Sequence, residues 1–132
     1  MLRTEQLHAP VTCARYSHDQ NCVLAASLDH RLRLLDRRNG QLFSTYRGHR
    51  AGSYRVQCAL SHDDALVLCG DELGHVFAWD LVEAEVCARV DAHRSATSAL
   101  QCHPTAPGFI SAGLDGQLIV WQRRNASTAV GR

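Results

Sequence analysis

The sequence has 132 residues, of which 45% are hydrophobic, so a single domain with a buried core is expected. Fourteen arginines, no lysine and 13 acidic residues leave a net charge of +1, too small to attract nucleic acid or an anionic membrane strongly. No apolar run is long enough to span a membrane, and no apolar secretory segment follows Met1. We therefore expect a protein of the cytoplasm and nucleus, without membrane association.

Six cysteines and eight histidines raise the question of disulfides or a metal site. The sequence contains no Cys-x-x-Cys pair and no His-x-x-x-His spacing, which are the usual ligand patterns. Most of the cysteines lie in alternating apolar segments, as buried free thiols do in a reducing compartment. We expect no metal, no cofactor and no disulfide framework.

One pattern occurs three times along the chain. Each copy begins near a histidine, passes an Asp-containing turn and ends at Trp-Asp or an altered form of it. The copies run from His8 to Leu35-Asp36, from His49 to Trp79-Asp80, and from His93 to Trp121-Gln122. The spacing is 41 residues between the first two histidines and 42 between the two tryptophans. This period is typical of the WD40 repeat, one four-stranded blade of a β-propeller.

Alternating apolar residues predict the strands of each copy. In chain order these are 11–16, 23–27, 32–36 and 42–46; then 56–60, 66–69, 76–80 and 86–90; then 99–102, 109–112 and 118–121. Asn39-Gly40 and Asp115-Gly116 are strong hairpin signals. No clear strand is predicted after Trp121, so the third copy is expected to lack its outer strand.

The predicted fold is therefore all-β, a partial WD40 propeller of three four-stranded antiparallel blades. Propellers usually have about 4–8 blades, so three blades are not expected to close a ring. Within the domain at 1–132, the blades are placed at 8–47, 48–92 and 93–122, with a polar tail at 123–132.

In intact blades a His, a Ser or Thr, an Asp and a Trp form a buried hydrogen-bonded chain, because buried polar groups need partners. Copy one keeps His8, Ser27 and Asp29 but has Leu35 at the Trp position. Copy two keeps His49 and Trp79, followed by Asp80, and its long turn leaves Asp71 or Glu72 for the Asp role. Copy three keeps His93, Asp115 and Trp121, with Ser111 or Gly113 near the Ser position.

Two segments, Ser17-His18-Asp19 and Ser61-His62-Asp63, contain the residues of a hydrolase triad. Consecutive residues cannot place three side chains in a relay, so turn formation is the favoured interpretation. With no other nucleophile–base pair, metal set or phosphate loop in the sequence, we do not expect an enzyme.

Two regions are expected to contact partners. The segments after the closing histidines, which include Arg50, Tyr54 and Arg94, connect successive blades on the face where propellers usually bind proteins. A basic cluster containing Arg31 and Arg33 precedes Leu42-Phe43. It is interpreted as a solvated strand face; a kinase docking element and an RNA contact are the alternatives.

Several segments resemble a known family more closely than the generic repeat does. They are 27–36 with its Leu-Leu-Asp ending, Gly40-Gln41-Leu42, 46–49, 76–83 with its Trp-Asp-Leu-Val-Glu, and His103-Pro104-Thr105. Together they resemble the last three blades of the mitogen-activated protein kinase organiser family of WD-repeat scaffolds, WD repeat protein 83. The resemblance covers almost the whole chain.

This resemblance implies a seven-bladed, non-catalytic propeller, of which the sequence would be a truncated form without the first four blades. It implies a scaffold for kinases of the ERK cascade and their adaptors, with a hypoxia-factor prolyl hydroxylase and splicing factors as further partners. The alternative hypothesis is a structural subunit of a pre-mRNA splicing complex, without direct nucleic-acid binding. Uncovered blade faces are expected to cause self-association or aggregation.

Overall fold

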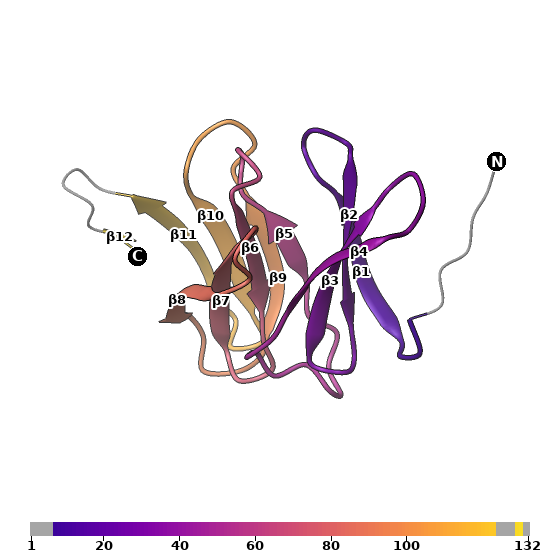
Figure 1. Cartoon of the computed structure of the whole chain (residues 1–132). Helices are drawn as coiled ribbons and strands as arrows, with labels where there is room; N and C mark the ends of the chain where they lie inside the picture. The colour runs from indigo at the N-terminus through magenta and orange to yellow at the C-terminus, as the bar shows by residue number, and fades with distance from the viewer. Residues whose placement is uncertain (1–6, 124–128, 131–132) are drawn as a thin grey trace.

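The computed structural model describes residues 7–123 and 129–130, and its strands form three separate four-stranded sheets (Figure 1). In each sheet consecutive strands pair antiparallel, in the orders β1-β2-β3-β4, β5-β6-β7-β8 and β9-β10-β11-β12. The first sheet comprises β1 (Val11–Tyr16), β2 (Cys22–Ser27), β3 (Arg31–Asp36) and β4 (Leu42–Tyr46). The second comprises β5 (Cys58–Leu60), β6 (Leu66–Gly70), β7 (His75–Asp80) and β8 (Val86–Asp91). The third comprises β9 (Thr97–Cys102), β10 (Phe109–Gly113), β11 (Leu118–Arg123) and β12 (Ala129–Val130).

This arrangement confirms the predicted all-β fold of three antiparallel blades that do not close. The expected absence of a fourth strand in the third blade is wrong, because β12 pairs with β11 through Gln122↔Val130 and Arg123↔Ala129. Two paired residues within a polar segment show no alternation that a sequence pattern could detect. Of the predicted polar tail, residues 124–128 and 131–132 lie outside the described part of the chain.

The core consists of two apolar layers, each between neighbouring blades. Side chains alternate across a strand, so Leu32 and Leu34 of β3 are buried on one face while Arg31 and Arg33 lie on the other. Leu32 and Leu34 belong to the first layer, together with Val67 and Trp79 of the second blade. The second layer joins the other face of the second blade to Leu100 and neighbouring residues of the third.

Two hydrogen bonds link the outer strand of the first blade to the second blade. The hydroxyl of Tyr46 donates to the carbonyl of Leu81 at 2.7 Å, and the indole Nε1 of Trp79 donates to the carbonyl of Arg47 at 2.8 Å. Each bond satisfies the polar end of a fully buried aromatic side chain. The blades are therefore held by directed polar contacts as well as by apolar burial.

The two ends of the row of blades have exposed apolar residues. On the third blade, Ile110, Leu118 and Val120 lie on one exposed face of β10 and β11. On the first blade, Val11 and Phe43 are exposed. The first and third blades lie on opposite sides of the second (Figure 1), so these surfaces remain uncovered by the described residues. Within the same residues, no helix is long and apolar enough to cross a membrane.

Candidate protein-binding face

Five connections lie together along the lower edge of the molecule in Figure 1, and we call this surface the loop face. It consists of residues 28–30, 47–57, 71–74, 92–96 and 114–117. Backbone hydrogen bonds join these connections: the amide of Glu72 donates to the carbonyl of Arg50 at 2.9 Å, and that of Leu114 to Ala96 at 3.0 Å. The loop face is thus an ordered surface that spans all three blades.

Beneath the loop face, the third blade contains a complete buried polar chain. The His93 ring contacts Asp115 through Nδ1 at 3.0 Å and the Ser111 hydroxyl through Nε2 at 2.9 Å. The indole of Trp121 donates to the same hydroxyl at 2.9 Å. Desolvation alone would raise the pKa of Asp115, but hydrogen bonds from the Arg94 and Gln117 amides and from His93 lower it. The structure therefore places Ser111, rather than Gly113, in the Ser position.

The second blade departs from this arrangement because its carboxylate comes from a different backbone position. The amide of Asp71 donates to the carbonyl of His75, as the amide of Gly113 does to Gln117, so Asp71 is the backbone counterpart of Gly113. A Cβ atom at Gly113 would collide with the ring of His93. In the second blade, the Cβ atom of Asp71 therefore occupies the space that a histidine ring would need. His49 cannot adopt the position that His93 has in the third blade.

His49 consequently lies buried without a polar partner. Its side chain packs edge-on against Trp79, with 5.2 Å between ring centroids, and only 3% of the residue is exposed. Neither ring nitrogen has a hydrogen-bond partner among the described residues. Burial lowers the pKa of His49 to about 4, so the ring is neutral at pH 7.

Asp71 bonds instead to its own turn and to the next connection. One carboxylate oxygen accepts the amides of Leu73 at 3.0 Å and His75 at 2.9 Å. The other accepts the amide of Arg50 at 3.3 Å and contacts the His75 ring at 3.1 Å. Asp71 thus shapes the loop face, while Asp80 bonds to the amides of Val82 and Glu83 in the turn after β7.

In the first blade, the expectation that His8 belongs to a buried polar chain is wrong. His8 is exposed, in the left-handed backbone region at φ 64°, before β1 begins. The Arg33 guanidinium takes its place, donating to the Ser27 hydroxyl and the Asp29 carboxylate at 2.7 Å each, and Ser27 donates to Asp29 at 2.6 Å. Desolvation would raise the pKa of Asp29, but these bonds and the Arg33 charge lower it.

Of the five residues expected to bind partners, two have the required exposure on the loop face: Arg50 and Arg94. Their amides are fixed by Asp71 and Asp115, at 3.3 and 3.0 Å. The other three are less accessible. Arg33 is committed to the contacts above and its side chain is only 13% exposed. Tyr54 is half-buried against the first core layer, and Arg31 is half-buried at the start of β3.

Two leucines on the loop face, which the sequence patterns did not single out, are exposed: Leu73 by 59% and Leu114 by 58%. Leu73 and Arg50 line a hollow of about 410 Å³ above His49 and Asp71. Arg94 lines a second hollow of about 390 Å³ beside Asp115. Each junction between blades therefore presents an arginine, and an exposed leucine lies in the adjoining turn.

The other sequence motifs do not form a reactive site. Ser17 and Ser61 donate to the aspartates two residues later, at 2.6 and 2.8 Å, which is the geometry of a local turn. His18 contacts Asp64 of the next blade at 2.7 Å instead of a serine. No group of three or more His, Cys, Asp or Glu side chains in the described residues is arranged to hold a metal.

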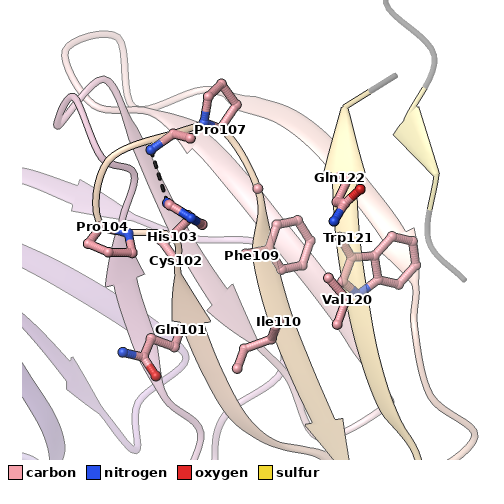
Figure 2. Close-up of a pocket in the computed structure, with 12 residues that line it drawn as sticks. Gln101, Cys102, His103, Pro104, Pro107, Phe109, Ile110, Val120, Trp121 and Gln122 are labelled. Atoms are coloured by element: carbon pink, nitrogen blue, oxygen red, sulfur yellow. Dashed lines mark hydrogen bonds between the residues drawn. The ribbon is translucent and has the colours of Figure 1, made fainter. Parts of the chain in front are cut away.

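A hollow of about 680 Å³ lies at the opposite end of the third blade (Figure 2). Phe109 and Trp121, stacked with 5.6 Å between centroids, and Ile110 and Val120 make up much of its apolar lining. The ring of His103, also in the lining, accepts the amide of Ala106 at 3.1 Å and so holds the β9–β10 connection. This lining offers apolar surface and no group of reactive side chains.

These features define a repeat protein of the propeller class, and the chain belongs to the WD40-repeat family. The family described as "WD domain, G-beta repeat" matches residues 1–36, 40–80 and 85–122. WD40 domains generally mediate protein–protein interactions, so the chain is a scaffold-type protein.

Among curated proteins, the chain is similar to WD repeat domain-containing protein 83. It is 35% identical to the Danio rerio protein over 91% of this chain and 38% of that protein. It is 36% identical to the Homo sapiens protein over 92% of this chain and 38% of that protein. The chain thus spans about 38% of the length of these relatives, so the activities of the whole proteins do not transfer to it directly.

Solved structures support the same fold. The chain superimposes on U3-55K with a TM-score of 0.81 and 18% identity, over 96% of this chain and 39% of that one. For the WD40 repeats of RRP9 the TM-score is 0.82, with 19% identity and the same coverage. At such low identity the likeness concerns the fold alone.

Proposed function

We propose that the chain is a non-catalytic scaffold that binds other proteins through the loop face. The observation that carries this proposal is the repeated pairing of an exposed arginine with an exposed leucine, on connections fixed by Asp71 and Asp115. Arginine is enriched at the energetically important centres of protein interfaces, and an exposed leucine beside it adds apolar surface that a partner can bury. A surface ordered before binding loses little conformational entropy when the partner arrives.

We further propose that these partners are kinases of the ERK cascade and their adaptors. The support is the 35–36% identity to WD repeat domain-containing protein 83 over about nine-tenths of this chain, and the resemblance of its motifs to the kinase organiser family. A hypoxia-factor prolyl hydroxylase is a further proposed partner on the same grounds. On the same grounds we propose that the protein acts in the cytoplasm and nucleus.

The second candidate function is that of a structural subunit in a pre-mRNA splicing complex, which the same family resemblance implies. The net charge of +1 favours protein contacts over direct RNA contacts for such a subunit. The two functions therefore differ in the identity of the bound proteins and not in the binding surface.

Recovery of partners with a tagged chain tests the proposal. The wild-type chain is compared with a variant carrying Arg50→Glu and Arg94→Glu, which leaves the backbone bonds to Asp71 and Asp115 in place. A variant with Glu83→Arg and Glu85→Arg, in the exposed connection after β7, is the control for charge change.

We expect ERK-cascade kinases with the wild type and the control, and at least about ten-fold less with the loop-face variant, which corresponds to a loss of about 1.4 kcal/mol of binding free energy. Recovery of splicing factors instead of kinases would support the second function. Equal recovery by all three chains would show that the loop face is not the binding surface.

A further inference from the structure

We propose that Cys13 and Cys58 form a reactive thiol pair, which a hydroperoxide converts into a disulfide that joins the first blade to the second. The proposal concerns a modification site and does not depend on which proteins the loop face binds.

The pair arises where two inner strands lie side by side. Cys13 is on β1 and Cys58 on β5, 45 residues apart in the chain. The Cys13 thiol donates to the carbonyl oxygen of Cys58 across 3.9 Å, and each thiol affects the pKa of the other. The Cys13 side chain thus lies against Cys58 across a blade boundary, and a disulfide requires two cysteines to be close neighbours.

The surroundings favour a thiolate on one member of the pair. Interactions with the Cys58 side chain and backbone, together with the Arg15 charge and side chain, lower the pKa of Cys13 to about 6, against the opposing effect of burial. Arg15 is held there by a bond from its Nε to the Cys58 carbonyl, at 3.3 Å. Cys13 is half-buried, which leaves it within reach of a small oxidant.

The other member has the opposite properties. Cys58 is fully buried, and its hydrogen bond to Cys13 and its desolvation raise its pKa well above the ordinary value. It is therefore protonated at pH 7 and shielded from the oxidant, but it lies against the sulfur that reacts first. A partly accessible thiol of low pKa beside a second cysteine that can resolve its oxidised form is typical of thiols that sense peroxide.

The reaction balances with hydrogen peroxide as the oxidant. The Cys13 thiolate attacks one peroxide oxygen, the O–O bond breaks, and the leaving hydroxide takes up a proton to become water, so Cys13 becomes a sulfenic acid. The Cys58 sulfur then attacks the Cys13 sulfur, the S–O bond breaks, and hydroxide leaves with the Cys58 proton as a second water. Two thiols are oxidised to one disulfide, and one peroxide is reduced to two waters.

The other cysteines provide internal controls. Cys87 is exposed on β8 and identifies unspecific surface oxidation. Burial raises the pKa of Cys102 to about 11, so this thiol is expected to react slowly. Cys69 is the cross-strand partner of Cys58, and a Cys58–Cys69 disulfide is therefore the main competing product.

The first experiment uses the wild-type chain. After brief exposure to hydrogen peroxide and alkylation of the remaining thiols, mass spectrometry of the unreduced digest maps the linked peptides. We expect a Cys13–Cys58 link that disappears on reduction. Without peroxide, alkylation of Cys13 should be half-maximal near pH 6 and, at pH 7, at least about ten-fold faster than that of Cys102.

Two variants extend the test. In Cys58→Ala, peroxide should leave a sulfenic acid on Cys13 that dimedone traps, whereas Cys87→Ala should form the Cys13–Cys58 link as the wild type does. A Cys58–Cys69 link, links through Cys87 alone, or alkylation of Cys13 as slow as that of Cys102 would overturn the proposal. The wild-type measurements decide the question even if Cys58→Ala is too unstable to use.

Discussion

Two histidines at equivalent connections have opposite environments, and this contrast shows what a polar group contributes to each blade. His93 bonds through both ring nitrogens, whereas both ring nitrogens of His49 are buried and find no hydrogen-bond partner in the described part of the chain. A buried polar group without a hydrogen-bond partner lowers the free energy of unfolding by about 1–3 kcal/mol. Removing one member of a buried hydrogen bond leaves the other member in that state. The two histidines should therefore respond differently to the same substitution.

We expect His49→Phe to leave the free energy of unfolding at pH 7 unchanged or higher, because an aromatic ring of similar shape replaces unmet polar atoms. His93→Phe should lower it by about 2–3 kcal/mol, because Ser111 and Asp115 each lose the buried hydrogen bond to the His93 ring, which a phenyl ring cannot replace. Urea denaturation measures both. Equal losses in the two variants would show that His49 has a polar partner after all.

The same histidine predicts a dependence on pH. The unfolded chain protonates His49 near pH 6.5 and the folded chain only near pH 4, so the unfolded state binds more protons between these values. Because His49 must stay neutral in the folded state, its contribution to the free energy of unfolding is fully present above pH 6.5. This contribution falls as the pH drops toward 4, and the total loss below pH 4 is about 3 kcal/mol. His49→Phe should reduce the loss measured between pH 7 and pH 4; an identical loss in this variant would contradict the assignment.

The sequence repeat predicts only part of these residue-level contacts. His93, Asp115 and Trp121 have the usual spacing, and the structure brings them together on Ser111. In the second blade, Asp71 stands at the backbone position that Gly113 has in the third blade. The spacing of the repeat does not reveal this equivalence. Arg33 reaches Ser27 and Asp29 from a neighbouring strand, a contact that depends on sheet register and not on a motif.

At the level of the elements, one glycine fixes the junction between the second and third blades. The Gly74 carbonyl accepts the amides of Ala92 at 3.0 Å and His93 at 2.9 Å. Gly74 has φ +91°, and a Cβ there would collide with the carbonyl of His93 and lie 2.7 Å from that of Ser95. The contacting atoms belong to the backbone, which cannot rotate away as a flexible side chain can.

We expect Gly74→Ala to lower the free energy of unfolding by more than about 3 kcal/mol, because the junction must shift. Gly116→Ala is the matched control: Gly116 has a similar φ of +83°, but a Cβ there meets nothing within 4 Å. Its cost should be only the left-handed backbone strain, about 1 kcal/mol. Chemical denaturation separates the two, and similar losses would mean that strain, not the junction, explains Gly74.

The strands themselves follow from sequence far better than their junctions do. The apolar segments of the repeat predict eleven of the 12 strands in the described residues, and alternation is clearest where a strand buries one face, as Leu32 and Leu34 do in β3. The short strand β12 buries no recognisable apolar pattern and is missed. The contact between Cys13 and Cys58 likewise depends on how two blades pack, which no local pattern encodes.

At the scale of the whole molecule, each blade is stabilised by its neighbours, as in other repeat proteins. The second blade is covered on both faces, whereas the outer face of the third exposes Leu118 by 68% and Val120 by 51%. Contiguous exposed apolar residues favour assembly. In the 132-residue chain, we expect these faces to associate with a second copy.

The central claim is that the exposed apolar faces of the end blades drive self-association. Light scattering of the purified chain as it leaves a sizing column measures its molar mass and tests this claim. We expect a discrete oligomer for the wild type and a shift toward monomer for Leu118→Lys combined with Val120→Lys, because the two lysines place charge on the exposed apolar face. Val82→Lys, at an isolated exposed turn residue, should behave as the wild type. A wild-type monomer that unfolds in one sharp, reversible and concentration-independent transition would show that the exposed blade faces do not drive self-association.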